Sequence, residues 1–126
     1  MIDQITNKDY LSFFDYCTRK KYLTDRKKIK LLYKSIIKFN IPCFVHSDWT
    51  GFILCYQRHL FLVVDNIKVA DDLLRIFLWN HNQYCKITLE YSVDFHKLLM
   101  KYRFKLVNRN GKINTYECLP RIKKND

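Results

Sequence analysis

The chain has 126 residues, 48% of them hydrophobic, and a formal net charge of +11. This length suits one core, since two halves would each be too small to fold alone, so we expect a single domain over residues 1–120 and a basic tail over residues 121–126. The apolar runs are too short to span a bilayer and no signal-peptide pattern opens the chain, which excludes a membrane protein and favours a cytoplasmic one.

The first part of the chain predicts one strand and two helices. The strand covers Ile2 to Thr6, and Asn7 is the expected N-cap of the helix that follows it. Apolar residues then recur at the spacing of a helix face in two sets, Tyr10, Phe13, Phe14 and Cys17, and Ile29, Leu32, Tyr33, Ile36 and Ile37. Pro42 ends the second helix, because a residue before proline avoids the helical conformation.

Three strands are expected in the middle of the chain, at Pro42 to Ser47, Gly51 to Gln57 and His59 to Val64. They are rich in β-branched and aromatic residues and are separated by short polar turns. This pattern is typical of an antiparallel meander.

The rest of the chain predicts two helices, a strand and a hairpin. The apolar face of the first helix is Ala70, Leu73, Leu74 and Phe77, and that of the second is Phe95, Leu98, Leu99 and Tyr102. A strand at Cys85 to Tyr91 lies between them, and Ser92 is the N-cap of the second helix. Strands at 104–108 and 113–119 form the hairpin, in which Asn110-Gly111 favours a type I′ turn.

The predicted order is β-α-α-β-β-β-α-β-α-β-β, an α/β (α+β) fold with one mixed sheet and helices on both faces. This order resembles the acyl-CoA N-acyltransferase fold of the GCN5-related N-acetyltransferase (GNAT) family. Three segments also resemble matching segments of that family: IDQITNKDY, TGFILCY and FHKLLMKYRFKLVNRNGKINTYEC. The resemblance covers nearly the whole chain and implies an acetyl-CoA site at the turn after the fourth strand.

The phosphate-binding pattern of that turn is missing. Working family members have Q/R-x-x-G-x-G/A there, with glycines because a Cβ would block the approach of the backbone to the pyrophosphate. Here residues 65–69 alone separate the strand from Ala70, and Gly51 and Gly111 lie elsewhere. Asp65 adds a negative charge that Lys68 offsets only in part. We therefore expect no acetyl-CoA cofactor, the alternative being a genome bias that removes glycines.

The general acid of the family is also missing. The late family helix often reads N-x-x-A-x-x-L-Y-E-K-L-G-F, and its tyrosine protonates the departing thiolate in many members. Aligned on Phe104, the tyrosine position holds Leu99, which cannot donate a proton, and the glycine position holds Arg103. Tyr102 lies at another helical phase and is expected to pack. The two losses together predict a protein without acetyl transfer and without catalytic residues.

The cysteine and histidine residues predict no metal site and no nucleophilic site. The five cysteines are odd in number, widely spaced and free of any C-x-x-C pair, so we interpret them as reduced core thiols in a reducing compartment. Cys43 and His46 would face opposite sides of a strand and would not converge on a metal ion. Catalysis by a Cys-His pair would need a third orienting group, and the sequence identifies none.

Three functions remain, and the first is our hypothesis: a catalytically inactive acetyltransferase-fold protein acting as a binding or assembly module. Its size, composition and lost motifs resemble small acetyltransferase-fold proteins of tailed bacteriophages, which would place it in the virion or the host cytoplasm. The second is a basic protein that contacts nucleic acid, with Arg26 and Lys28 in its surface. The third is an acetyltransferase with a remodelled acetyl-CoA loop.

The partner surface is expected at basic residues that lie off the apolar helix faces. Its partner would be an acidic protein surface or a nucleic-acid backbone, and the oligomeric state stays open. The residues are Arg19, Lys20, Lys21, Lys27, Lys30, Lys34 and Lys38. The alternatives are a solvated face and a lysine excess that reflects an AT-rich genome.

Overall fold

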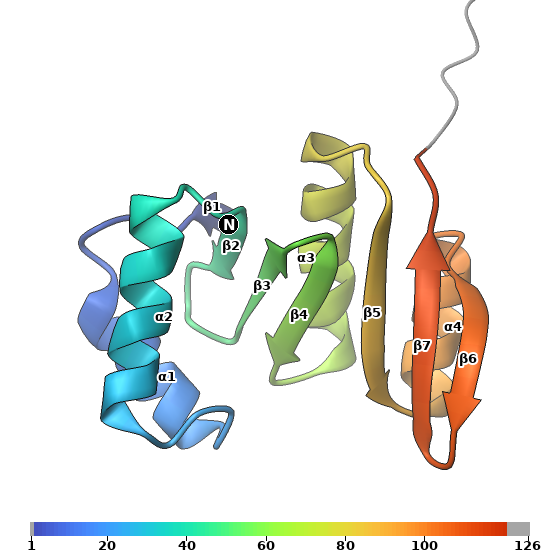
Figure 1. The fold of residues 1–126 in the computed structure, drawn as a ribbon, viewed down its shortest axis with the longest axis horizontal. Coiled ribbons are helices and arrows are strands. Elements are labelled where there is room, and N and C mark those ends of the chain that lie inside the picture. The colour runs from blue at the N-terminus through green and yellow to red at the C-terminus, as the bar shows by residue number, and fades with distance from the viewer. Residues whose placement is uncertain (1, 121–126) are drawn as a thin grey trace, which may run out of the picture.

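The computed structural model describes residues 2–120 and shows a mixed sheet with helices packed against it (Figure 1). The elements are β1 (Ile2–Gln4), α1 (Tyr10–Arg19), α2 (Arg26–Lys38), β2 (Cys43–His46), β3 (Gly51–Tyr56), β4 (His59–Val64), α3 (Ile67–Asn80), β5 (Cys85–Glu90), α4 (Val93–Lys101), β6 (Lys105–Asn110) and β7 (Ile113–Cys118). This is the predicted order, so the fold class is confirmed. The predicted tail, residues 121–126, lies outside the described residues.

The seven strands lie side by side in the order β1-β2-β3-β4-β5-β7-β6. Neighbouring strands are antiparallel except β4 and β5, which are parallel. The predicted meander of β2, β3 and β4 is therefore confirmed. None of the helices within residues 2–120 has both the length and the apolar character needed to cross a membrane.

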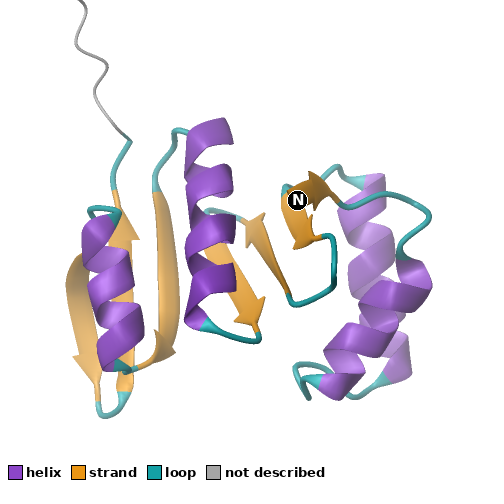
Figure 2. Ribbon diagram, turned by 180° about the vertical axis from the view of Figure 1, so that it is seen from behind, coloured by secondary structure: helices purple, strands orange, loops and turns teal. Residues whose placement is uncertain are grey.

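The sheet is covered by helices on both faces (Figure 2), and β3 marks the division between the two layers. Phe52 and Leu54 pack in one core cluster with residues of α1 and α2, whereas Ile53 and Cys55 pack in another with residues of α3 and α4. This arrangement follows from the alternation of side chains along a strand. It places α3 and α4 together on the face opposite the lysine-rich helix α2.

All five cysteines are buried, as predicted, and within the described residues none forms a disulfide. Burial raises the pKa of the Cys17 thiol to about 12. Removal from water disfavours the thiolate, which is the reactive form of cysteine. These side chains therefore act as small apolar groups of the core.

Two helix starts differ from the sequence prediction. Asn7 is not the N-cap of α1, because the helix begins at Tyr10 and its cap is Asp9. Asp9 instead accepts a hydrogen bond from the backbone N–H of Thr6 (2.7 Å), which holds the turn before the helix. Helix α3 begins at Ile67, one turn before the apolar positions that predicted it, because Asn66 caps it through its side chain.

The type I′ turn also lies in a different hairpin from the predicted one. The turn between β3 and β4 has positive φ at both Gln57 (51°) and Arg58 (65°), as type I′ requires. In the later hairpin Asn110 still pairs with Ile113, so the two-residue loop is Gly111-Lys112. Of these two residues only Gly111 has positive φ (61°), which suits a type II′ turn instead.

Candidate ligand cleft between β4 and β5

The parallel strands β4 and β5 pair at only one end. Their register covers His59↔Lys86 and Leu60↔Ile87, and no pairing follows toward their carboxyl ends. A cavity of about 700 Å³ opens there, lined by residues 61–64 of β4, residues 88–90 of β5, the turn before α3, the start of α4, and Lys20 and Tyr22. Backbone N–H and C=O groups of both strands are thus free to meet a ligand in this cleft.

Asp65 is the central charged residue at the end of β4. The Tyr16 hydroxyl donates a hydrogen bond to the Asp65 carboxylate, with 3.0 Å between the oxygens. The Nζ of Lys20 lies 3.2 Å from the same carboxylate, and a guanidinium nitrogen of Arg19 lies 4.0 Å from it. Burial and the neighbouring Asp65 raise the pKa of the Tyr16 phenol far above its usual value. The two cations are therefore engaged by the protein's own carboxylate.

The turn that leads from β4 into α3 has few free backbone donors. It consists of Asp65 and Asn66, the latter being the N-cap of α3. The N–H of Asp65 donates to the Thr50 carbonyl oxygen (2.8 Å), and the N–H of Val69 donates to the Asn66 side chain (3.0 Å). Capping of this kind satisfies the donors that a helix start would otherwise offer to an anion.

Gly51 has a packing role beside this turn rather than a ligand role. A Cβ at Gly51 would lie 2.7 Å from Cγ1 of Val69 and 2.9 Å from Cγ1 of Val64. The glycine thus lets β3 approach the start of α3 and the end of β4. Neither glycine of the chain belongs to the turn of residues 65–66.

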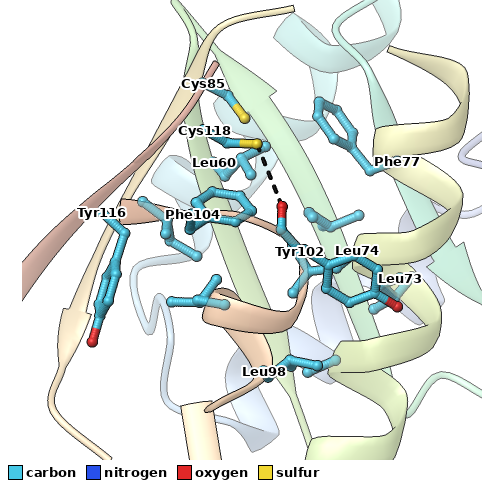
Figure 3. Close-up of a cluster of buried hydrophobic side chains, with 14 of the residues drawn as sticks. Leu60, Leu73, Leu74, Phe77, Cys85, Leu98, Tyr102, Phe104, Tyr116 and Cys118 are labelled. Atoms are coloured by element: carbon cyan, nitrogen blue, oxygen red, sulfur yellow. Dashed lines mark hydrogen bonds between the residues drawn. The ribbon is translucent and has the colours of Figure 1, made fainter. Parts of the chain in front are cut away.

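Leu99 and Tyr102 both belong to the core between α3, α4 and the sheet (Figure 3). Leu99 is fully buried and lies outside the lining of the cleft. The Tyr102 hydroxyl donates to the Asp71 carboxylate, and burial together with Asp71 raises the pKa of this phenol to about 12. The tyrosines that do line the cleft are Tyr22 and Tyr91. Sequence reasoning had not singled out either of them.

The structure separates the seven predicted partner residues into two groups. Arg19 and Lys20 lie at the end of α1, where they face Asp65. The others are exposed to solvent, and they are Lys21, Lys27, Lys30, Lys34 and Lys38. The four on α2 form a lysine face, which we define as Lys27, Lys30, Lys34 and Lys38.

Potential metal ligands are not gathered in the part of the chain that the structure describes. Within residues 2–120 no group of three His, Cys, Asp or Glu side chains is placed to hold a metal ion. Cys43 is buried, while His46 on the other face of β2 contacts Asp48 (Nδ1 to Oδ1, 2.7 Å). The two side chains diverge as the strand geometry requires.

The comparisons with known proteins are structural, since no family model and no curated protein matches the sequence significantly. The chain is similar to an N-acetyltransferase from Staphylococcus aureus, with a TM-score of 0.69, 14% identity, and coverage of 94% of this chain and 96% of that chain. It is similar to ribosomal-protein-alanine N-acetyltransferase from Brucella melitensis, with a TM-score of 0.69, 9% identity and coverage of 94% and 99%. A GNAT-family acetyltransferase from Listeria monocytogenes gives a TM-score of 0.57, 9% identity and coverage of 94% and 93%.

These likenesses extend over nearly the whole chain and establish its fold. The chain has the acyl-CoA N-acyltransferase fold of GNAT acetyltransferases, as the sequence resemblance implied. Sequence identity of this order shows the fold alone. The activity has to be argued from the cleft itself.

Proposed function

We propose that this chain is a GNAT-fold protein that does not transfer acetyl groups and that acts as a binding or assembly module. The observation that carries the proposal is the turn after β4, where Asp65 and the Asn66 cap occupy the place at which the fold binds coenzyme A phosphates. The function of such a chain has to rest on the surfaces that remain.

The residues of the turn do not fit the pyrophosphate of acetyl-CoA. Bound phosphates need free backbone N–H groups or unpaired cations. Two N–H groups of this region already donate to Thr50 and Asn66, and Lys20 and Arg19 already face Asp65. A diphosphate would also bring its negative charge close to the Asp65 carboxylate. Like charges at such distances repel strongly in a partly buried site.

The lysine face of α2 supports a role in binding. The apolar side of α2 packs on the sheet through Ile29, Tyr33 and Ile36, so the lysines project away from the core. Lys30, Lys34 and Lys38 follow at four-residue spacing, at which like charges on a helix repel by a few tenths of a kcal/mol per pair. The isolated fold gains nothing from this repulsion, whereas an acidic protein surface would relieve it.

Two further features support the setting of the proposal. The small chain, its composition and its lost motifs resemble acetyltransferase-fold proteins of tailed bacteriophages, which favours a virion-associated assembly role. The net charge of +11 supports a second candidate, binding to a nucleic-acid backbone through the same lysine face. Such binding would weaken steeply with salt, whereas a shape-complementary protein contact would weaken less.

Replacing Lys27, Lys30 and Lys34 with glutamate should leave the protein folded and abolish assembly. The side chains are exposed, so the circular dichroism spectrum and thermal midpoint should change little. The measurements are co-sedimentation with the complex that the chain enters in its own cell and, separately, with duplex DNA at low and physiological salt. Loss of the first indicates a protein partner, and loss of a salt-dependent second indicates nucleic acid.

A matched control makes the same change of charge elsewhere. Lys8, Lys97 and Lys105 are exposed and lie outside α2. Their replacement with glutamate should leave co-sedimentation unchanged, because exposed charges act over only about 8 Å at physiological salt. Normal assembly of the α2 variant, or equal loss in both variants, would show that the lysine face is only solvated.

A further inference from the structure

A second cavity of about 700 Å³ lies between the start of α4 and the tip of the β6–β7 hairpin. The backbone N–H of Tyr91 donates to the carbonyl oxygen of Lys112 (2.7 Å), which fastens the hairpin tip to the end of β5. A volume of this size falls in the range of small-molecule sites, about 300–1,000 Å³. The residues used below are Glu90, Tyr91, His96, Arg109, Lys112 and Asn114.

Asn114 is a buried polar side chain in the lining of this cavity, with 1% of its surface exposed. Its Nδ2 donates to the Tyr116 hydroxyl (3.3 Å), which in turn lies 2.8 Å from Nδ1 of His96. Figure 3 shows the Tyr116 hydroxyl directed away from the labelled apolar side chains. The Oδ1 of Asn114 has no hydrogen-bond partner. Since buried amide oxygens are normally hydrogen-bonded, a donor is missing beside this atom.

The charged side chains of the lining are also without partners in the protein. Arg109 is the register partner of Asn114 on β6, which directs both side chains to the same face of the hairpin. Lys112 lies in the hairpin turn, and Glu90 ends β5. Within residues 2–120, none of these three charges takes part in an ion pair. The cavity thus offers two cations and one carboxylate to an occupant.

We propose that this cavity binds a small zwitterion of the α-amino acid class. Its carboxylate meets the guanidinium of Arg109 and the ammonium of Lys112, a pairing that guanidinium geometry favours. Its ammonium donates to the Glu90 carboxylate and, with a small turn of the amide, to Oδ1 of Asn114. Its side chain lies against the rings of Tyr91 and His96, whose centroids are 5.9 Å apart.

A ligand with both signs is the one that satisfies this set of groups. A simple anion would leave the Asn114 oxygen without a donor and would face the Glu90 carboxylate. A simple cation would face Arg109 and Lys112. The cavity shares Glu90 and Tyr91 with the cleft between β4 and β5, but it includes no residue of the lysine face. The inference therefore stands or falls independently of the proposed partner surface.

The test is a titration of the ¹⁵N-labelled protein with glycine, leucine, phenylalanine and glutamate, followed by NMR. Binding of at least one of them should shift the side-chain amide signal of Asn114 and the Nε signal of Arg109 together. Acetate and methylamine, which carry the two charged groups separately, should shift neither at the same concentration. Replacing Arg109 with glutamine should weaken binding about tenfold or more, because a charge-assisted hydrogen bond is lost.

Lys105→Gln is the matched control, since Lys105 is an exposed cation at the other end of β6. This variant should bind as the unchanged protein does, and the amide spectra of both variants should show a native fold. Three results would overturn the inference: no shift with any of the four amino acids, binding of acetate as tight as that of the amino acids, or unchanged affinity in Arg109→Gln.

Discussion

Replacing Leu99 with tyrosine is expected to produce no acetyl transfer and to lower the free energy of unfolding by about 1–3 kcal/mol. Leu99 has no exposed surface and packs in the core between α4 and the sheet. A tyrosine ring would have to enter a filled space, and its hydroxyl would need a partner there. A general acid can act only on a thioester that is already bound and oriented, and the turn after β4 does not hold one.

Urea denaturation and a thiol-release assay with acetyl-CoA and a panel of amines measure the two parts of this prediction. Leu99→Met is the control, because a swap of similar volume should cost less than about 1.5 kcal/mol. Acetyl transfer by the tyrosine variant would contradict the account, since it would show that the cofactor site still works.

Replacing Asp65 with alanine is the second change with a large expected effect. The Tyr16 hydroxyl would lose its carboxylate acceptor, and Lys20 would remain beside Arg19 without a counterion. The free energy of unfolding should fall by about 1–3 kcal/mol, the cost of leaving such groups unsatisfied. Asp15→Ala is the control, because Asp15 is an exposed residue of α1 and its loss should cost within about 0.5 kcal/mol.

The same network predicts an alkaline loss of stability. The pKa of the Tyr16 phenol is raised above its unfolded value of 10.0 by burial and by Asp65. The folded state therefore favours the neutral phenol, whose stabilising contribution is complete below pH 10 and is lost as the pH rises above it. The buried thiols titrate in the same direction, so the comparison is between Tyr16→Phe and the unchanged protein. Equal slopes of stability against pH above 10 in the two proteins would contradict this role of Tyr16.

The element order could be read from the sequence because it depends on local patterns. The apolar spacing of Ile29, Tyr33 and Ile36 marks the buried face of α2, and Ser92 accepts the capping hydrogen bond from Phe95 as its position predicts. Strands β2 to β4 are likewise short runs of β-branched and aromatic residues between polar turns. Each of these signals lies within a few residues of the structure that it specifies.

The features of the candidate sites depend instead on contacts between distant residues. Tyr16 and Asp65 are 49 positions apart, and nothing near either residue indicates the other. Tyr16 also lies outside the predicted apolar face of the first helix, although it is fully buried. Asn114 follows the strand alternation as an inward residue, but its buried amide and its contact with Tyr116 arise only when α4 packs on β7. Tertiary packing decides these positions, so the two cavities became visible only in the structure.

Calorimetric titration of the purified protein with acetyl-CoA tests the central proposal most directly. The ligand needs free donors and cations at the turn between β4 and α3, and there Asn66 caps the helix while Asp65 engages Lys20 and Arg19. The account predicts no saturable heat of binding, even at millimolar ligand. A saturable titration with a micromolar dissociation constant would contradict it, because the fold would then still hold the cofactor of its enzymatic relatives.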